Sequence, residues 1–144
     1  MTKQINIYRG ILESDTCGVR PGIKFDDIVK FSKEDLDGKK LTYGYYINFR
    51  KPQWITSIFF IDNLFFREDG TVSWFMLKPS FNNVADEDRF GYCKRWLSDS
   101  IQMRPYKDED DEIIYRFGWG WVSCSINPKS KSSDPEIKFV YTDV

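Results

Sequence analysis

The side chains most able to do chemistry in this sequence are carboxylates and thiols, because the chain contains no histidine. Ser-His and Cys-His nucleophile pairs, histidine acid–base catalysis and most zinc sites are therefore excluded. Cys17, Cys93 and Cys124 are an odd number of cysteines without a C-x-x-C motif. This pattern indicates free, buried thiols in a reducing compartment, so we expect a cytoplasmic protein. We identify no catalytic residue, no metal ligand and no cofactor site, and we do not expect an enzyme.

The densest charge in the chain is an acidic run at residues 108–112, "DEDDE". Carboxylate oxygens suit Ca²⁺ or Mg²⁺, but this run lacks the glycine and the spacing of an EF-hand loop. A solvated loop is one interpretation, and a contact surface for a basic partner is the functional one. The candidate partner-binding residues of this run are Asp108, Glu109, Asp110, Asp111 and Glu112.

A second candidate is the E-x-K pattern of Glu136 and Lys138, which matches half of the strand motif of metal-dependent nucleases. Alternation on a strand places both side chains on one face. No well-placed upstream aspartate completes the motif, so a carboxylate- and metal-dependent hydrolase is the least favoured alternative.

Large rings alternate with glycines in "RFGWGWVSCSI", residues 116–126. On one continuous strand over 113–126, Trp119 and Trp121 share a face with Tyr115 and Phe117. The favoured interpretation packs this face beneath a helix. The alternative is an exposed aromatic ridge in which Trp119 and Trp121 anchor a partner.

The elements that must position these residues follow from hydrophobic spacing. Phe90, Cys93, Leu97 and Ile101 recur at helical intervals and predict a long helix at about 84–103. A short helix is expected near 25–36, and Asp69-Gly70 predicts a hairpin turn that sets Phe65 across from Val72 and Trp74. The remaining strands are expected at 4–12, 41–49, 54–61, 113–126 and 137–144, with a turn at 50–53.

These elements predict one α+β domain over residues 1–144. Its predicted architecture is a mostly antiparallel sheet of about six to seven strands, with the long helix packed on one face. The net charge of −1 argues against binding nucleic acid by bulk electrostatics. No apolar run approaches the ~20 residues of a membrane span, so we expect no membrane partner. Loop cations near aromatic residues keep single-stranded nucleic acid open as an alternative.

Three stretches together resemble a known class of proteins: "CGVRPGIKFDDIVKF", the paired "YGYYINF" and "ITSIFFIDNLFF", and the closing "YRFGWGWVSCSINPKSKSSDPEIKFVY". The layout resembles small bacterial immunity proteins, the partners of polymorphic toxins and of contact-dependent growth inhibition systems. The resemblance implies a cytoplasmic domain that binds one cognate toxin and blocks its active site or its access to substrate. A basic nuclease domain is a toxin that would suit the acidic run. The alternatives are a nucleic-acid-binding or phage-type inhibitory module and the hydrolase named above.

Overall fold

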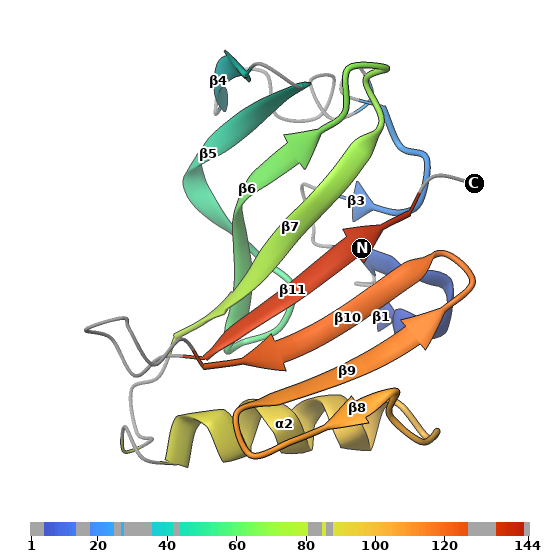
Figure 1. Cartoon of the computed structure of the whole chain (residues 1–144). Coiled ribbons are helices and arrows are strands. Elements are labelled where there is room, and N and C mark those ends of the chain that lie inside the picture. The colour runs from blue at the N-terminus through green and yellow to red at the C-terminus, as the bar shows by residue number, and fades with distance from the viewer. Residues whose placement is uncertain are drawn as a thin grey trace.

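The computed structural model (Figure 1) describes residues 5–13, 18–24, 27, 36–41, 44–80, 85, 88–126 and 135–142, with the backbone alone for 36–41. Most of these residues belong to strands. In chain order the elements are β1 (Ile5–Asn6), the 3-10 turn η1 (Ile7–Arg9), β2 (Ile11–Glu13), β3 (Gly18–Val19), β4 (Leu36–Leu41), β5 (Gly44–Trp54), β6 (Phe59–Phe66), β7 (Val72–Pro79), α2 (Arg89–Ser100), β8 (Lys107–Asp108), β9 (Glu112–Phe117), β10 (Gly120–Ser125) and β11 (Glu136–Tyr141).

The strands form two antiparallel sheets. The large sheet has eight strands in the order β4-β5-β6-β7-β11-β10-β9-β8, and a small sheet has the order β1-β2-β3. In Figure 1, α2 runs along the β8–β10 end of the large sheet. The predicted α+β fold with a mostly antiparallel sheet and a helix on one face is confirmed, although the strands are more numerous than predicted.

The two faces of the large sheet differ in character. On the inner face, which α2 and the small sheet contact, the register aligns a buried row across four strands: Tyr115, Val122, Phe139 and Phe75. On the outer face the equivalent row is partly exposed: Arg116, Trp121, Val140, Trp74, Phe65 and Tyr46. The core therefore lies between the inner face, α2 and the small sheet.

The predicted single strand over 113–126 is wrong, because the chain reverses within it. β9 and β10 form a hairpin in which Phe117 pairs with Gly120 around a two-residue turn. The reversal pairs Tyr115 with Val122 and Ile113 with Cys124, so these residues share the inner face. It moves Trp121 opposite Arg116, on the outer face.

The turn predicted at 50–53 is displaced along the chain. β5 continues to Trp54, and the reversal occurs at residues 55–58, where Thr56 Oγ1 accepts hydrogen bonds from the amides of Ile58 and Phe59. Pro52 lies inside β5 at the register shift between Asn48 and Gln53. A strand tolerates proline at such an irregularity because its missing N–H breaks no regular ladder bond.

The hairpin between β6 and β7 is confirmed at the predicted turn. The amide of Arg67 donates to the carbonyl of Thr71 at 2.8 Å, with Asp69 and Gly70 between them. Phe65 pairs directly with Trp74. The loop is longer than a two-residue turn, since β6 ends at Phe66 and β7 begins at Val72.

The predicted helix boundaries change. α2 has 12 residues and ends at Ser100, because Ile101 is already extended with φ −125°. Only two residues of the short helix predicted near 25–36 are described: Asp27 is helical, and Leu36 begins strand β4. The strand predicted over 4–12 is divided into β1, η1 and β2. Within the described ranges, no helix combines the length and hydropathy needed to cross a lipid bilayer.

Side-chain contacts attach the small sheet and α2 to the inner face. Phe59 packs on Trp96 of α2 with ring centroids 4.6 Å apart. The Tyr141 hydroxyl donates to the carbonyl of Gly10 at 2.6 Å, in a buried position. Cys93 of α2 and Cys124 of β10 are fully buried, free cysteines.

Candidate functional site

The acidic run forms a turn at the edge of the large sheet, which we name the acidic turn (residues 108–112). It joins β8 to β9, and backbone hydrogen bonds hold both the turn and the strands that flank it. The amide of Glu109 donates to the carbonyl of Glu112 at 2.8 Å, and the amide of Ile126 donates to the carbonyl of Asp111 at 3.0 Å. On the β8 side, the amide of Tyr106 donates to the carbonyl of Ile114 at 2.8 Å. The carboxylates therefore stand on a fixed backbone.

Two lysines neutralise part of the acidic turn. Lys94 of α2 lies 2.6 Å from Asp108 Oδ1. Lys107 Nζ lies 2.8 Å from Glu112 Oε1 and 3.5 Å from Glu109 Oε2. The hydrogen bond to Glu112, followed by the charge of Glu109, raises the pKa of Lys107 above its ordinary value.

Asp110 and Asp111 differ from the other three carboxylates. Both are exposed, and neither forms an ion pair with a residue that the structure describes. Five carboxylates and two ammonium groups leave the cluster a formal charge of −3. The unpaired part of that charge is concentrated on Asp110 and Asp111.

Trp119 belongs to the core, as the favoured interpretation of the sequence expected. It is 7% exposed, and its indole N–H donates to the carbonyls of Ile7 and Tyr8 at 3.0 and 3.1 Å. Its ring stacks on Phe117 with centroids 5.2 Å apart. Little of Trp119 remains for a partner to touch.

Trp121 lies on the outer face and is partly exposed, so the favoured interpretation, which packed it in the core beside Trp119, is wrong for this residue. The two tryptophans and the acidic turn do not form one site. Trp119 occupies the turn at one end of β10, whereas Ser125 at the other end pairs with Glu112. Partner binding through the acidic turn and through Trp121 stays a prediction.

An aromatic stack lies on the outer face, and the sequence predicted only its central pair, Phe65 across from Trp74. Phe65 and Trp74 are stacked with centroids 3.9 Å apart and an interplanar angle of 6°. Tyr46 lies 5.6 Å from Phe65, and Lys138 Nζ lies 4.4 Å from the centre of the Trp74 ring. Neighbours thus cover the ring faces of Phe65 and Trp74, which a nucleic-acid base would need for stacking.

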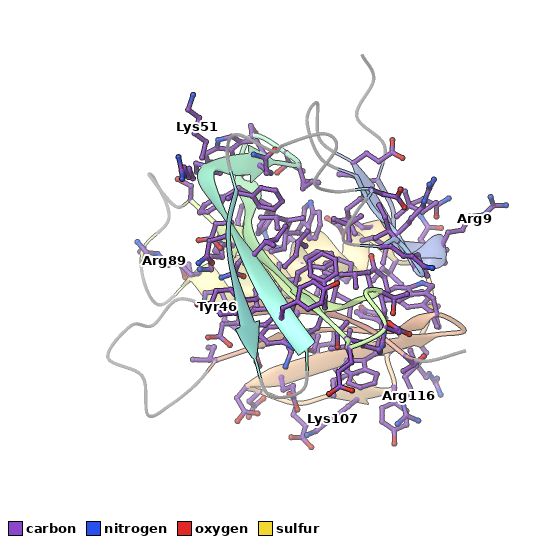
Figure 2. All side chains as sticks on the ribbon, turned by 90° about the horizontal axis from the view of Figure 1, so that it is seen from above. Arg9, Tyr46, Lys51, Arg89, Lys107 and Arg116 are labelled. Carbon is purple, nitrogen blue, oxygen red and sulfur yellow. The ribbon has the colours of Figure 1, made fainter. Side chains whose placement is uncertain are left out.

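Cations accompany this face at its β8–β9 end. Arg116 lies over the ring of Tyr106, with 3.6 Å between the guanidinium carbon and the ring centroid. Figure 2 shows Lys107 and Arg116 projecting from the side of the sheet away from α2.

Glu136 is exposed, and Lys138 is engaged with Trp74, so the E-x-K pair is not directed at a shared ligand. Among the described residues, no group of three or more Cys, Asp or Glu side chains is arranged to hold a metal ion.

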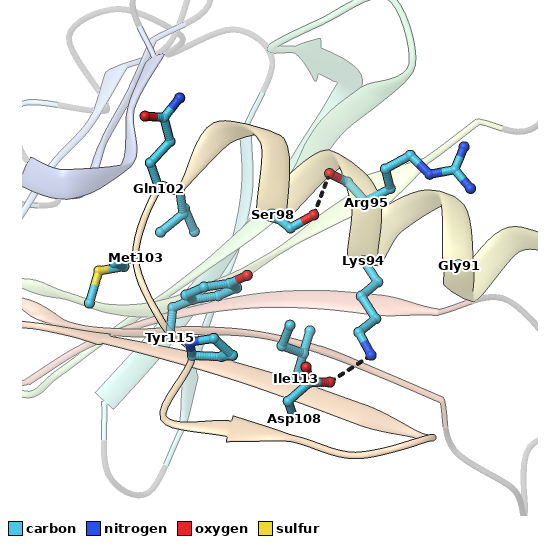
Figure 3. Close-up of a pocket in the computed structure, with 11 residues that line it drawn as sticks. Gly91, Lys94, Arg95, Ser98, Gln102, Met103, Asp108, Ile113 and Tyr115 are labelled. Atoms are coloured by element: carbon cyan, nitrogen blue, oxygen red, sulfur yellow. Dashed lines mark hydrogen bonds and ion pairs between the residues drawn. The ribbon is translucent and has the colours of Figure 1, made fainter.

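A groove lies between α2 and the β8–β9 edge, on the inner side of the sheet (Figure 3). Its volume is about 630 Å³. Its walls come from α2, from the segment that follows α2, and from β8 and β9. The residues that line it are Gly91, Lys94, Arg95, Ser98, Ile101, Gln102, Met103, Pro105, Asp108, Ile113 and Tyr115. Of the candidates taken from the sequence, only Asp108 belongs to this groove.

The described cysteines show no sign of a reactive thiol. The neighbouring Cys93 thiol and burial both favour the protonated form of Cys124 and raise the pKa of its thiol. A protonated, buried thiol is a poor nucleophile. Cys93 and Cys124 therefore act as packing residues, and Cys17 lies outside the described residues.

Comparison of the chain with protein-family models, with curated proteins and with solved structures finds no significant match. The chemistry of the described surface therefore carries the functional argument.

Proposed function

We propose that this chain is a non-catalytic protein-binding domain: an immunity protein that binds a cognate toxin domain in the cytoplasm and blocks its active site or its access to substrate. The observation that carries the proposal is the acidic turn, in which Asp110 and Asp111 are exposed and unpaired on a hydrogen-bonded backbone. The resemblance in sequence layout to immunity proteins supports the same conclusion.

Fixed charges favour rapid and selective association. A turn already ordered by backbone hydrogen bonds loses little conformational entropy when a partner binds. Complementary charge steers diffusional encounter and raises the association rate, most strongly at low salt. Lys94 and Lys107 hold Asp108, Glu109 and Glu112, so the steering falls mainly to Asp110 and Asp111.

The proposal predicts a basic protein partner that carries a toxin domain. The first experiment captures binding proteins from the source cell's lysate and secreted fraction with the tagged chain, and identifies them by mass. Coexpression of the captured domain with this chain should then restore growth that the domain alone suppresses. If no such domain is captured, or if a captured toxin stays active in the complex, the proposal is wrong.

The role of the acidic turn is tested with the purified partner. Replacing Asp110 and Asp111 together by asparagine should slow association on the order of tenfold at low ionic strength and flatten its salt dependence. The double variant Asp27→Asn, Glu68→Gln removes the same charge from two exposed positions elsewhere in the sequence and serves as the control. Equal effects of the two variants would show that net charge alone, rather than this turn, governs association.

A further inference from the structure

The large sheet ends at β8, and this edge is open. β8 pairs with β9 on one side, and no strand in the described part of the chain pairs with its other side. An open edge presents backbone groups that another strand can bind. Both charged side chains of β8 are already paired within the chain, Lys107 with Glu112 at 2.8 Å and Asp108 with Lys94 at 2.6 Å. The edge therefore keeps neither of its own charges free to repel a second strand.

The two ends of this edge carry opposite charges. At the end where β8 begins, Arg104 and Arg116 are exposed, and neither forms an ion pair with a described residue. The guanidinium of Arg116 is held 3.6 Å from the centre of the Tyr106 ring, and a guanidinium stacked in this way keeps its N–H groups free to bind a carboxylate. At the other end, β8 leads into the acidic turn, where Asp110 and Asp111 are exposed and unpaired.

Large apolar side chains are uncovered at the arginine end of the same edge. Tyr106 is 61% exposed and Met103 is 42% exposed, and both lie in the segment between α2 and β8. Tyrosine, methionine and arginine are the residue types that protein interfaces favour over the rest of the surface. This end therefore offers apolar area to a partner as well as charge.

The direction of pairing decides which charges meet. Antiparallel pairing of two copies about a two-fold axis places the arginine end of each copy beside the acidic end of the other. Parallel pairing would instead place like charges together. We propose that the β8 edge binds a second copy of this chain in the antiparallel direction. Arg104 and Arg116 of each copy face Asp110 and Asp111 of the other, and Tyr106 is buried in the contact.

This association does not rest on the immunity function proposed above. A second copy and a basic toxin would bind the same two carboxylates, Asp110 and Asp111, so the toxin should dissociate the dimer. The association is tested on the isolated chain, and the immunity function is tested with a captured toxin. A chain that stays monomeric would overturn the dimer and leave the immunity proposal intact.

Sedimentation velocity of the purified chain, from micromolar to millimolar concentration, measures the association. We expect a reversible monomer–dimer equilibrium that weakens as salt is added, because salt screens exposed ion pairs. Reversing one end, by Arg104→Glu with Arg116→Glu or by Asp110→Arg with Asp111→Arg, should raise the dissociation constant about tenfold or more, since like charges then meet. All four positions are exposed, so these variants keep the core. A monomer at every concentration would overturn the proposal.

A variant with all four reversals separates this edge from net charge. It exchanges the signs of the two ends and leaves the net charge at −1, so it should dimerise as the unmodified chain does. The matched control is Arg9→Glu with Arg20→Glu, at two exposed positions outside β8, and it should leave the dissociation constant unchanged. Failure of the four reversals to restore the dimer, or an equal loss in the control, would contradict the assignment.

Discussion

The contact between Gly10 and Trp119 gives the sharpest stability prediction. Gly10 ends η1 with φ +70°, in the left-handed region that side chains rarely adopt. A Cβ built on Gly10 would lie 2.7 Å from Cδ2 of Trp119 and 2.9 Å from Cε2. The indole cannot withdraw freely, because its N–H is hydrogen-bonded to the carbonyls of Ile7 and Tyr8. Gly10→Ala should therefore strain both the backbone and the packing.

The expected magnitude has two parts. A left-handed conformation costs an alanine about 1–2 kcal/mol. Forcing a methyl group into a well-packed core costs about 1–3 kcal/mol more. We expect Gly10→Ala to lower the free energy of unfolding by about 2–5 kcal/mol, a large fraction of the stability of a domain of this size.

Gly22 provides the matched control for the backbone part. Its φ is +81°, and no heavy atom lies within 4 Å of a Cβ built on it. Gly22→Ala should therefore cost only the backbone part, about 1–2 kcal/mol. Urea unfolding of the three proteins, followed by tryptophan fluorescence, measures both values. Equal losses in the two variants would refute the close packing of Trp119 on Gly10.

Two further predictions concern titratable groups. Asp69 Oδ1 accepts hydrogen bonds from the hydroxyl and the amide of Thr71. These hydrogen bonds lower the pKa of Asp69 below its ordinary value of 3.8. The ionised carboxylate therefore stabilises the folded state above pH 3.8, and this stabilisation is lost as the pH falls through the folded-state pKa. Asp69→Asn should reduce the loss of stability on acidification, measured by urea unfolding across that range, and parallel pH profiles for the two proteins would contradict this. In the folded protein, Cys93 and Cys124 should resist alkylation by iodoacetamide at mildly alkaline pH, because burial keeps both thiols inaccessible and a raised pKa keeps Cys124 protonated. In guanidinium both cysteines should react, and peptide mass spectrometry measures the alkylation in each case. Rapid alkylation of either cysteine in the folded state would show that α2 separates readily from β10.

The features that could be predicted from sequence are those that local chemistry determines. Asp69-Gly70 between two aromatic runs specifies a reversal whatever surrounds it, and the pairing of Phe65 with Trp74 follows from that reversal. The apolar spacing of Cys93 and Leu97 likewise places α2 against the sheet, where both are fully buried. Each signal is complete within a few residues of the chain.

The groove could not be found in this way, because its parts are distant in sequence. Lys94 and Tyr115 come from a helix and a strand, and only the packing of α2 against the β8–β9 edge brings them to one space. Nothing in the local sequence marks Tyr115 as a residue that lines a groove. That position depends on the packing of α2 and therefore on the whole fold.

The "FGWGW" stretch shows why alternation alone does not define a strand. On a continuous strand, Trp119 and Trp121 share a face. A two-residue turn instead pairs Phe117 with Gly120, places Trp119 in the turn and sends Trp121 to the face opposite Tyr115. The turn itself carries no Asn-Gly or Asp-Gly signal. The position of this turn depends instead on a segment more than 100 residues away in the sequence. In that segment the carbonyls of Ile7 and Tyr8 accept the indole hydrogen bonds of Trp119, and Gly10 leaves space for its ring. Two tryptophans only two positions apart therefore occupy different environments: Trp119 packs in the core, and Trp121 is partly exposed on the outer face, where a partner could contact it.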